Sequence, residues 1–61
     1  MTIQEIIDYL DSIPHETFSF TIQDNFITIF FAPSNKTRIK LPGFDVFEVN
    51  NIYKIKGELE Q

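Results

Sequence analysis

Residues 17–31 read TFSFTIQDNFITIFF, and this stretch decides the fold. Its apolar side chains recur with a period of two, which is typical of β-strands, and Asp24-Asn25 interrupts them where a two-residue hairpin loop fits. Such a loop places Ile22 opposite Ile27 and Phe18 opposite Phe31. One face of the hairpin is then wholly apolar: Phe18, Phe20, Ile22, Ile27, Ile29 and Phe31. A shift of one residue would destroy this segregation, so the pattern specifies the register.

The next segment, residues 37–41, alternates again after a loop at residues 32–36. Pairing it with the second strand of the hairpin keeps apolar residues together, because Ile39 then faces Ile29 and Leu41 faces Ile27. The same register predicts Arg38 opposite Phe30 and Lys40 opposite Thr28. We therefore expect these two basic residues on the outer face of the sheet.

Two further strands are predicted beyond the break at Pro42-Gly43. Residues 44–49 and 52–56 flank Asn50-Asn51, a pair suited to a type I′ turn because Asn tolerates positive φ. This hairpin places Val46 opposite Ile55 and Asp45 opposite Lys56. Residues 58–61 are expected to fray, with the position of Leu59 left open.

A short amphipathic helix is predicted in front of the hairpin. Thr2 and Glu5 have the spacing of a capping box, and Met1 can pack on Ile6, which indicates that the helix begins at the natural start of the protein. Pro14 ends the helix at about Ser12 or Ile13. The apolar stripe consists of Ile3, Ile6, Ile7, Leu10 and Ile13.

We expect an α+β fold, with an N-terminal helix packed on a small, mainly antiparallel four-stranded sheet in the order α-β-β-β-β, which is one strand fewer than the five extended segments described above. We expect one small domain over residues 1–61. Leu, Ile, Val and Phe supply more than a third of the chain, which is ample for folding. The core of a domain of this size is marginal, and this chain has no Cys with which to form a disulfide. Good packing or oligomerisation must therefore stabilise it.

The charge and the termini exclude several classes of protein. The net charge of −4 disfavours non-specific binding to phosphates or anionic lipids. The first residues contain no basic leader and the apolar runs are short, so we expect neither a signal peptide nor a membrane span. The absence of Cys is compatible with a reducing compartment, and we expect the protein to be cytoplasmic.

Catalysis is not expected, because nucleophile, base and orienting group would have to converge in one pocket. His15, the one imidazole, is interpreted as a solvated loop residue rather than as a base for Ser12 or Ser19. A zinc site would need about four Cys or His ligands, which the chain does not have. We expect no cofactor and no metal.

Two surface features predict binding to another protein. The first is the outer sheet face with Phe26 and Phe30 beside Arg38 and Lys40, since aromatic and Arg side chains supply most binding hot spots. An alternative is that the C-terminal segment, with Phe44 and Phe47, folds back over this face. A second alternative is a single-stranded nucleic acid stacked on the two rings, which the acidic remainder of the chain disfavours.

The second feature is an acidic ridge on the predicted helix, Glu5, Asp8 and Asp11, which is either a solvated face or a complement to a basic partner. In size and acidity the chain is similar to small accessory proteins of bacteria, plasmids and phages, a resemblance that rests on no motif. We therefore expect a non-enzymatic interaction module, an accessory or inhibitor protein that acts by stoichiometric binding and forms a homodimer. A purely structural homo-oligomer subunit is the remaining alternative.

Overall fold

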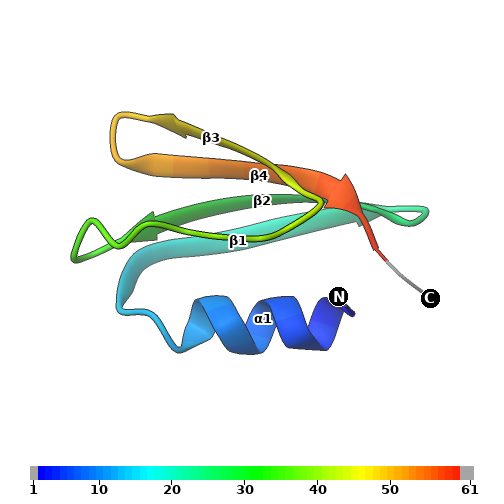
Figure 1. Ribbon diagram of the computed structural model, residues 1–61, viewed down its shortest axis with the longest axis horizontal. Coiled ribbons are helices and arrows are strands. Elements are labelled where there is room, and N and C mark those ends of the chain that lie inside the picture. The colour runs from blue at the N-terminus through cyan, green and yellow to red at the C-terminus, as the bar shows by residue number, and fades with distance from the viewer. Residues whose placement is uncertain (1, 60–61) are drawn as a thin grey trace.

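The computed structural model describes residues 2–59, and within them the chain forms one helix and four strands. The elements follow one another as α1 (Ile3–Asp11), β1 (His15–Gln23), β2 (Phe26–Pro33), β3 (Asp45–Val49) and β4 (Ile52–Glu58). Figure 1 shows two layers, with α1 on one side of the sheet. The predicted α+β fold with an N-terminal helix and four antiparallel strands is confirmed.

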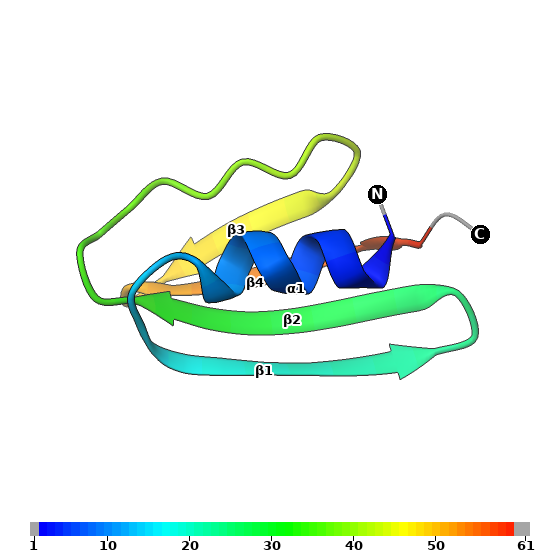
Figure 2. The same cartoon turned by 90° about the horizontal axis from the view of Figure 1, so that it is seen from below.

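The strands lie in the order β1-β2-β4-β3, and each neighbouring pair is antiparallel. The chain therefore does not pass from β2 directly into β4, which is the neighbour of β2 in the sheet. Residues 34–44 carry it along the helix side of the sheet to the far edge, where β3 begins (Figure 2). The last strand, β4, then returns to fill the place between β3 and β2.

The predicted pairing of residues 37–41 with β2 is wrong, because these residues form no strand and β4 occupies the position beside β2. Ile55 takes the place opposite Ile29 that the sequence had suggested for Ile39. Ile39 and Leu41 are nevertheless buried, at 5% and 4% exposure, because the connection lays both side chains into the core. Their burial was predicted correctly although their backbone conformation was not.

Both hairpin registers agree with the sequence prediction. β1 and β2 pair Phe18 with Phe31 and Ile22 with Ile27, and the irregularity in this ladder is confined to its start at His15 and Thr17. The second hairpin pairs Val46 with Ile55 and Asp45 with Lys56. Its turn residues, Asn50 and Asn51, have φ values of 53° and 66°, as a type I′ turn requires.

The capping box at the start of α1 is also present. The Glu5 backbone N–H donates to the Thr2 hydroxyl at 3.2 Å, and the Thr2 N–H donates back to the Glu5 carboxylate at 2.9 Å. The helix ends at Asp11 with Ser12 as its C-cap, close to the predicted end. The suggested contact of Met1 with Ile6 lies outside the described residues.

The core lies between the sheet and the layer formed by α1 and the connection. Its buried members are Ile6, Leu10, Ile27, Ile29, Phe31, Ile39, Leu41 and Ile55. Each large apolar side chain that is fully buried here stabilises the fold by about 1.5–3 kcal/mol. The sheet supplies half of these buried residues, and the helix and the connection supply the other half in equal parts.

Two further contacts complete the core near the end of the chain. The ring of Phe44 lies against Gly57 so closely that a Cβ atom at this position would overlap it. Leu59 packs against the core, and its backbone N–H donates to the carbonyl oxygen of Asn25. The expected fraying therefore does not begin at Glu58 or Leu59, while the last two residues of that prediction lie outside the described part of the chain.

Candidate interaction surface

The sheet face opposite α1, called the outer face from here on, is built from rows of side chains that cross the strands. One row runs from Ser19 through Phe30 and Lys54 to Phe47, because the three strand pairings place these residues directly opposite one another. The next row runs through Thr21, Thr28, Lys56 and Asp45. Side chains in such rows are close neighbours, so each row presents a continuous surface.

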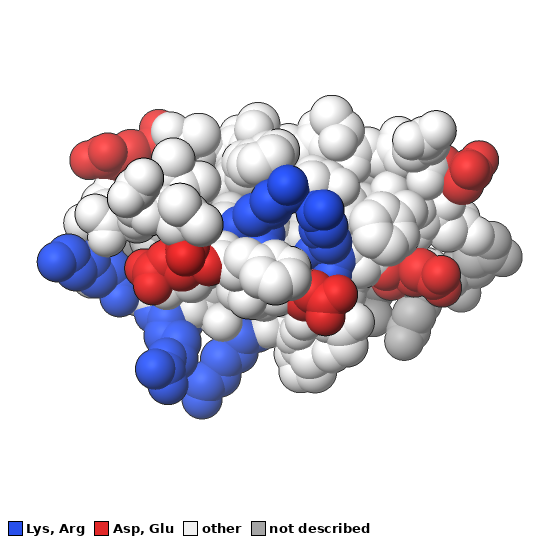
Figure 3. Space-filling view, turned by 90° about the horizontal axis from the view of Figure 1, so that it is seen from above, with Lys and Arg blue, Asp and Glu red and all other residues white. Residues whose placement is uncertain are grey.

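The outer face carries large apolar side chains that remain in contact with solvent. Their exposed fractions are 45% for Phe26, 40% for Phe30, 54% for Phe47, 65% for Val49 and 42% for Ile52. Single exposed apolar residues are ordinary, whereas a large contiguous apolar patch is typical of binding surfaces. Figure 3 looks onto this face and shows basic side chains near its middle, white residues around them and acidic side chains nearer its rim.

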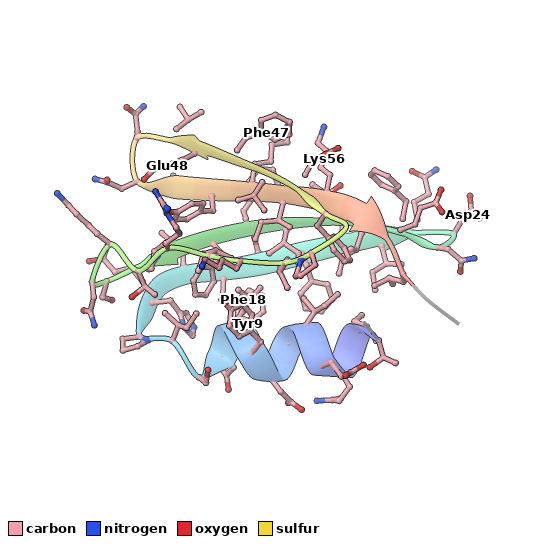
Figure 4. All side chains as sticks on the ribbon, in the orientation of Figure 1. Tyr9, Phe18, Asp24, Phe47, Glu48 and Lys56 are labelled. Carbon is pink, nitrogen blue, oxygen red and sulfur yellow. The ribbon has the colours of Figure 1, made fainter. Side chains whose placement is uncertain are left out.

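The cations beside Phe30 are Lys54 and Lys56, not Arg38 and Lys40 as predicted. Lys54 lies between the rings of Phe30 and Phe47 in its row, and its Nζ atom is 5.7 Å from the centre of the Phe30 ring. This distance lies within the range of a cation–π contact. Figure 4 shows Phe47 and Lys56 projecting away from the helix, on the same side of the sheet.

Arg38 and Lys40 lie on the connection at the helix side of the sheet, exposed to solvent. The backbone N–H of Lys40 donates to the Tyr9 hydroxyl at 3.2 Å, which ties this segment to α1. The prediction failed because it treated residues 37–41 as a strand. These two cations are therefore separated from Phe26 and Phe30 by the thickness of the sheet.

The C-terminal half does not fold back over the outer face within residues 2–59. β3 and β4 extend the sheet sideways, and Phe44 packs on the inner side against Gly57. Phe47 adds a third ring to the outer face instead of covering the other two. The described part of the chain thus leaves this face open.

The acidic ridge of Glu5, Asp8 and Asp11 lies on the exposed side of α1, away from the buried Ile6 and Leu10. Two of its members have local partners: Glu5 closes the capping box, and Asp8 accepts a hydrogen bond from the Gln4 amide at 2.9 Å. Hydrogen bonds from the Thr2 backbone N–H and hydroxyl hold the pKa of Glu5 below its ordinary value of 4.5. A flat partner cannot contact this ridge and the outer face together, because the helix and the sheet lie between them.

His15 is not the solvated loop residue that the sequence suggested. It is the first residue of β1 and is half-buried, with its ring 5.2 Å from the Phe31 ring and 5.5 Å from the Phe18 ring. Its Nδ1 lies 2.8 Å from the Ile13 carbonyl oxygen, and because a carbonyl only accepts, Nδ1 carries the proton. This contact orients the ring as a packing group at the start of the strand.

A hollow of about 360 Å³ lies where the start of β1, the loop after β2 and the β3–β4 turn meet. Its charged side chains are Glu16, Lys36 and Glu48, and each of them is exposed.

Among residues 2–59 no group of three His, Cys, Asp or Glu side chains is placed to hold a metal ion. No helix in the same range is long and apolar enough to cross a bilayer.

Sequence reasoning placed Phe26 and Phe30 on this surface but missed Phe47, Lys54 and Lys56. The signal that could have found the two lysines is the alternation Lys54-Ile55-Lys56. Because Ile55 is apolar and points into the core, its two neighbours in the strand must lie on the outer face. Comparisons with protein-family models, with curated protein sequences and with solved structures found nothing that matches this chain. The function of this chain is therefore inferred from its fold and its outer face.

Proposed function

We propose that this chain is a non-enzymatic protein-binding module that acts by stoichiometric binding, as an accessory or inhibitor protein in the cytoplasm. The observation that carries the proposal is the row Phe30–Lys54–Phe47, two exposed rings with a cation between them in the sequence of the row, on an outer face that the described part of the chain leaves open. Aromatic rings at the centre of a flat face supply most of the binding free energy in protein interfaces, while surrounding contacts exclude water.

The chemistry of the outer face selects the kind of partner. Lys54 lies over the Phe30 ring and opposite Phe47 in the sheet, where an approaching partner removes water from its ammonium group and strengthens its interaction with an opposing charge. A buried cation without a counter-charge is costly, so the partner needs a carboxylate at this place. The partner is therefore an apolar protein surface with an acidic group near its centre.

The test is a comparison of variants that alter one surface each. The doubly substituted Phe47→Ser/Lys54→Glu chain changes the central row, and the Asp8→Lys/Asp11→Lys chain changes the acidic ridge as a matched control. A partner captured from the source cell by the wild type is purified and titrated with all three chains by calorimetry. We expect a 1:1 complex that weakens at least about thirtyfold for the outer-face variant.

The control variant should retain the wild-type dissociation constant. Equal binding by the outer-face variant would overturn the proposal. Loss of binding by the helix variant alone would also overturn it and would move the binding site to the acidic ridge. Circular dichroism of each variant checks that the fold is intact. All four substituted residues are exposed or half-exposed, so their replacement leaves the core unchanged.

A second candidate, single-stranded nucleic acid, is favoured by one observation, namely that Lys54 and Lys56 lie beside the rings of Phe30 and Phe47. Bases stack on aromatic rings, and cations beside them contact phosphates. Asp45 and Glu58 on the same face, together with the net charge of −4, oppose a phosphate backbone. Titration of a labelled oligonucleotide at two salt concentrations separates the candidates, because only nucleic-acid binding weakens steeply with salt.

A further inference from the structure

The two edge strands of the sheet differ in how well they are protected from pairing with another strand. β3 has five residues, of which Asp45 and Glu48 are charged. β1 has nine residues, and its stretch Thr17–Gln23 contains neither a charge nor a proline. Natural proteins guard their edges with charges, prolines and short strands, because an edge exposes unpaired backbone groups. The β1 edge has no charged residue and no proline over seven consecutive residues.

The side chains along this edge are also incompletely covered. Phe20 and Ile22 point to the helix side of the sheet, yet 41% and 43% of their surfaces are exposed. Figure 2 shows the reason, since α1 lies over the middle of the sheet and leaves β1 outside its cover. Phe18 is better buried because it packs against Phe31 and His15.

The hairpin turn determines which backbone groups of β1 point outward. Gln23 and Phe26 flank the two-residue turn and form its hydrogen-bonded pair, so the odd-numbered residues of β1 bond to β2. The N–H and C=O groups of Phe18, Phe20 and Ile22 then face away from the sheet. The same three residues therefore provide the unpaired backbone groups and the apolar side chains of this edge.

We propose that a second copy of this chain pairs with β1 along this edge, antiparallel and centred on Phe20. In this register Phe20 faces its own counterpart, and Phe18 faces Ile22 of the second copy. On the outer face Ser19 meets Thr21 and Thr17 meets Gln23 of the second copy. Every apolar residue thus lies opposite an apolar residue, and no charged residue is enclosed.

The symmetry of the stretch selects a second copy over an unrelated strand. Thr17–Gln23 has its apolar residues at equal distances on either side of Phe20, so it complements itself under two-fold rotation. A shift of two residues in either direction places Glu16 opposite Ile22 or Asp24 opposite Phe18. Both alternatives oppose a carboxylate to an apolar side chain, and the centred register avoids both. It places Glu16 opposite Asp24 of the second copy beyond the paired stretch, where both side chains are exposed to solvent.

The pairing joins two four-stranded sheets into one of eight strands, with both helices on the same side. Phe20 and Ile22 of both copies then fill the space between the helices, and the outer faces merge into one larger surface. This inference does not rest on the proposed binding of a partner, because it uses a different surface. A dimer formed in this way would stabilise the fold by burying apolar surface that the small core of one domain leaves exposed.

The test measures mass against concentration by sedimentation and follows amide exchange residue by residue. We expect a dimer whose dissociation constant weakens more than about thirtyfold in the Phe20→Lys/Ile22→Lys variant, because ammonium groups then meet across the two-fold axis. Phe47→Lys on the opposite edge is the matched control and should leave the dimer unchanged. In the wild type, the amides of Phe18, Phe20 and Ile22 should become protected as concentration rises.

The amides of Ser19 and Thr21 should be protected at every concentration, since they bond to β2 in the monomer. A wild-type chain that stays monomeric up to millimolar concentration overturns the inference. A dimer that survives the Phe20→Lys/Ile22→Lys change but is lost with Phe47→Lys also overturns it, because the outer face would then be the dimer contact. The exchange measurement needs no variant, so the inference is tested even if a substituted chain fails to fold.

Discussion

Phe30 and Phe31 are neighbours in β2 with identical side chains, yet one is 40% exposed on the outer face and the other is fully buried on the inner face. The difference shows how a small protein divides its apolar residues between two tasks. The inner side chains of β2 are covered by α1 and the connection, so their burial stabilises the fold. The outer side chains gain little from folding and remain available for contact with another molecule.

The largest expected effect is the contrast between alanine substitutions at these two positions. Phe31→Ala should lower the free energy of unfolding by about 3–5 kcal/mol, since it leaves a cavity among fully buried side chains. Phe30→Ala should cost less than about 1 kcal/mol, because the ring is already in contact with water. Urea unfolding of both variants gives the comparison. Similar losses at the two positions would break the distinction between the faces.

A smaller loss of stability is expected from a substitution at Gly57, where the Phe44 ring covers the inner face of the sheet. Gly57→Ala adds a methyl group at the place occupied by the Phe44 ring, so the ring and the start of β3 must move. Overpacking of this kind costs about 1–3 kcal/mol. Lys56→Ala, one residue away on the outer face, serves as the control and should be nearly neutral. A stable Gly57→Ala variant would mean that Phe44 is not required to cover the inner face.

The helix that covers the inner face depends on its first turn. Thr2→Ala removes the hydroxyl that accepts from the Glu5 backbone N–H and should lower the free energy of unfolding by about 0.5–2 kcal/mol. Thermal unfolding measures the loss, and amide exchange in α1 shows whether it begins at the cap. Asp11→Asn, at the other end of the helix, should be neutral or slightly stabilising because it removes an acidic group near the negative end of the helix dipole.

The smallest effect is a pH dependence at the same cap. The folded-state pKa of Glu5 lies below its ordinary value of 4.5, so its contribution to stability is present above that pH and is lost as pH falls through the folded-state pKa. Wild type should therefore exceed Glu5→Gln in stability at pH 7, and the difference should shrink toward pH 3. Unfolding curves at the two pH values measure it. A constant difference would show that the carboxylate charge plays no part in the cap.

Much of the sheet was predictable because strong local patterns specify it. The register of β1 and β2 follows from one apolar face and a two-residue turn, since any slip would expose that face. The pairing of Val46 with Ile55 follows in the same way from the Asn50-Asn51 turn. In both hairpins the partners are close in sequence, so turn chemistry and alternation are sufficient.

The neighbour of β2 was not predictable, because two segments present the same pattern to it. Arg38-Ile39-Lys40 and Lys54-Ile55-Lys56 both consist of an isoleucine between two cations, and either places an isoleucine opposite Ile29. The second segment is a strand already paired with β3, so its hairpin binds β2 as a unit. Residues 37–41 have no such hairpin partner, and Pro42 follows them directly.

The similarity of these two segments also explains why the predicted interaction surface was only partly correct. The sequence correctly placed Phe26 and Phe30 on the outer face, but it left open whether the C-terminal segment covers that face. It assigned the wrong cations because the two segments have the same charges at the same spacing. The third ring, Phe47, was missed because its position depends on β3 lying beside β4 and not over the sheet.

The route of residues 34–44 has a consequence for the integrity of the chain. This connection bears the exposed side chains of Arg38 and Lys40 in a segment without helix or strand, and cleavage there by trypsin requires the buried Ile39 and Leu41 beside them to leave the core. Scission there would separate a helix–hairpin fragment from a hairpin fragment, which remain joined by six paired positions between β2 and β4. Ile39 or Leu41 would still anchor the new end in the core. We expect two such fragments, produced separately, to reassemble through the pairing of β2 with β4.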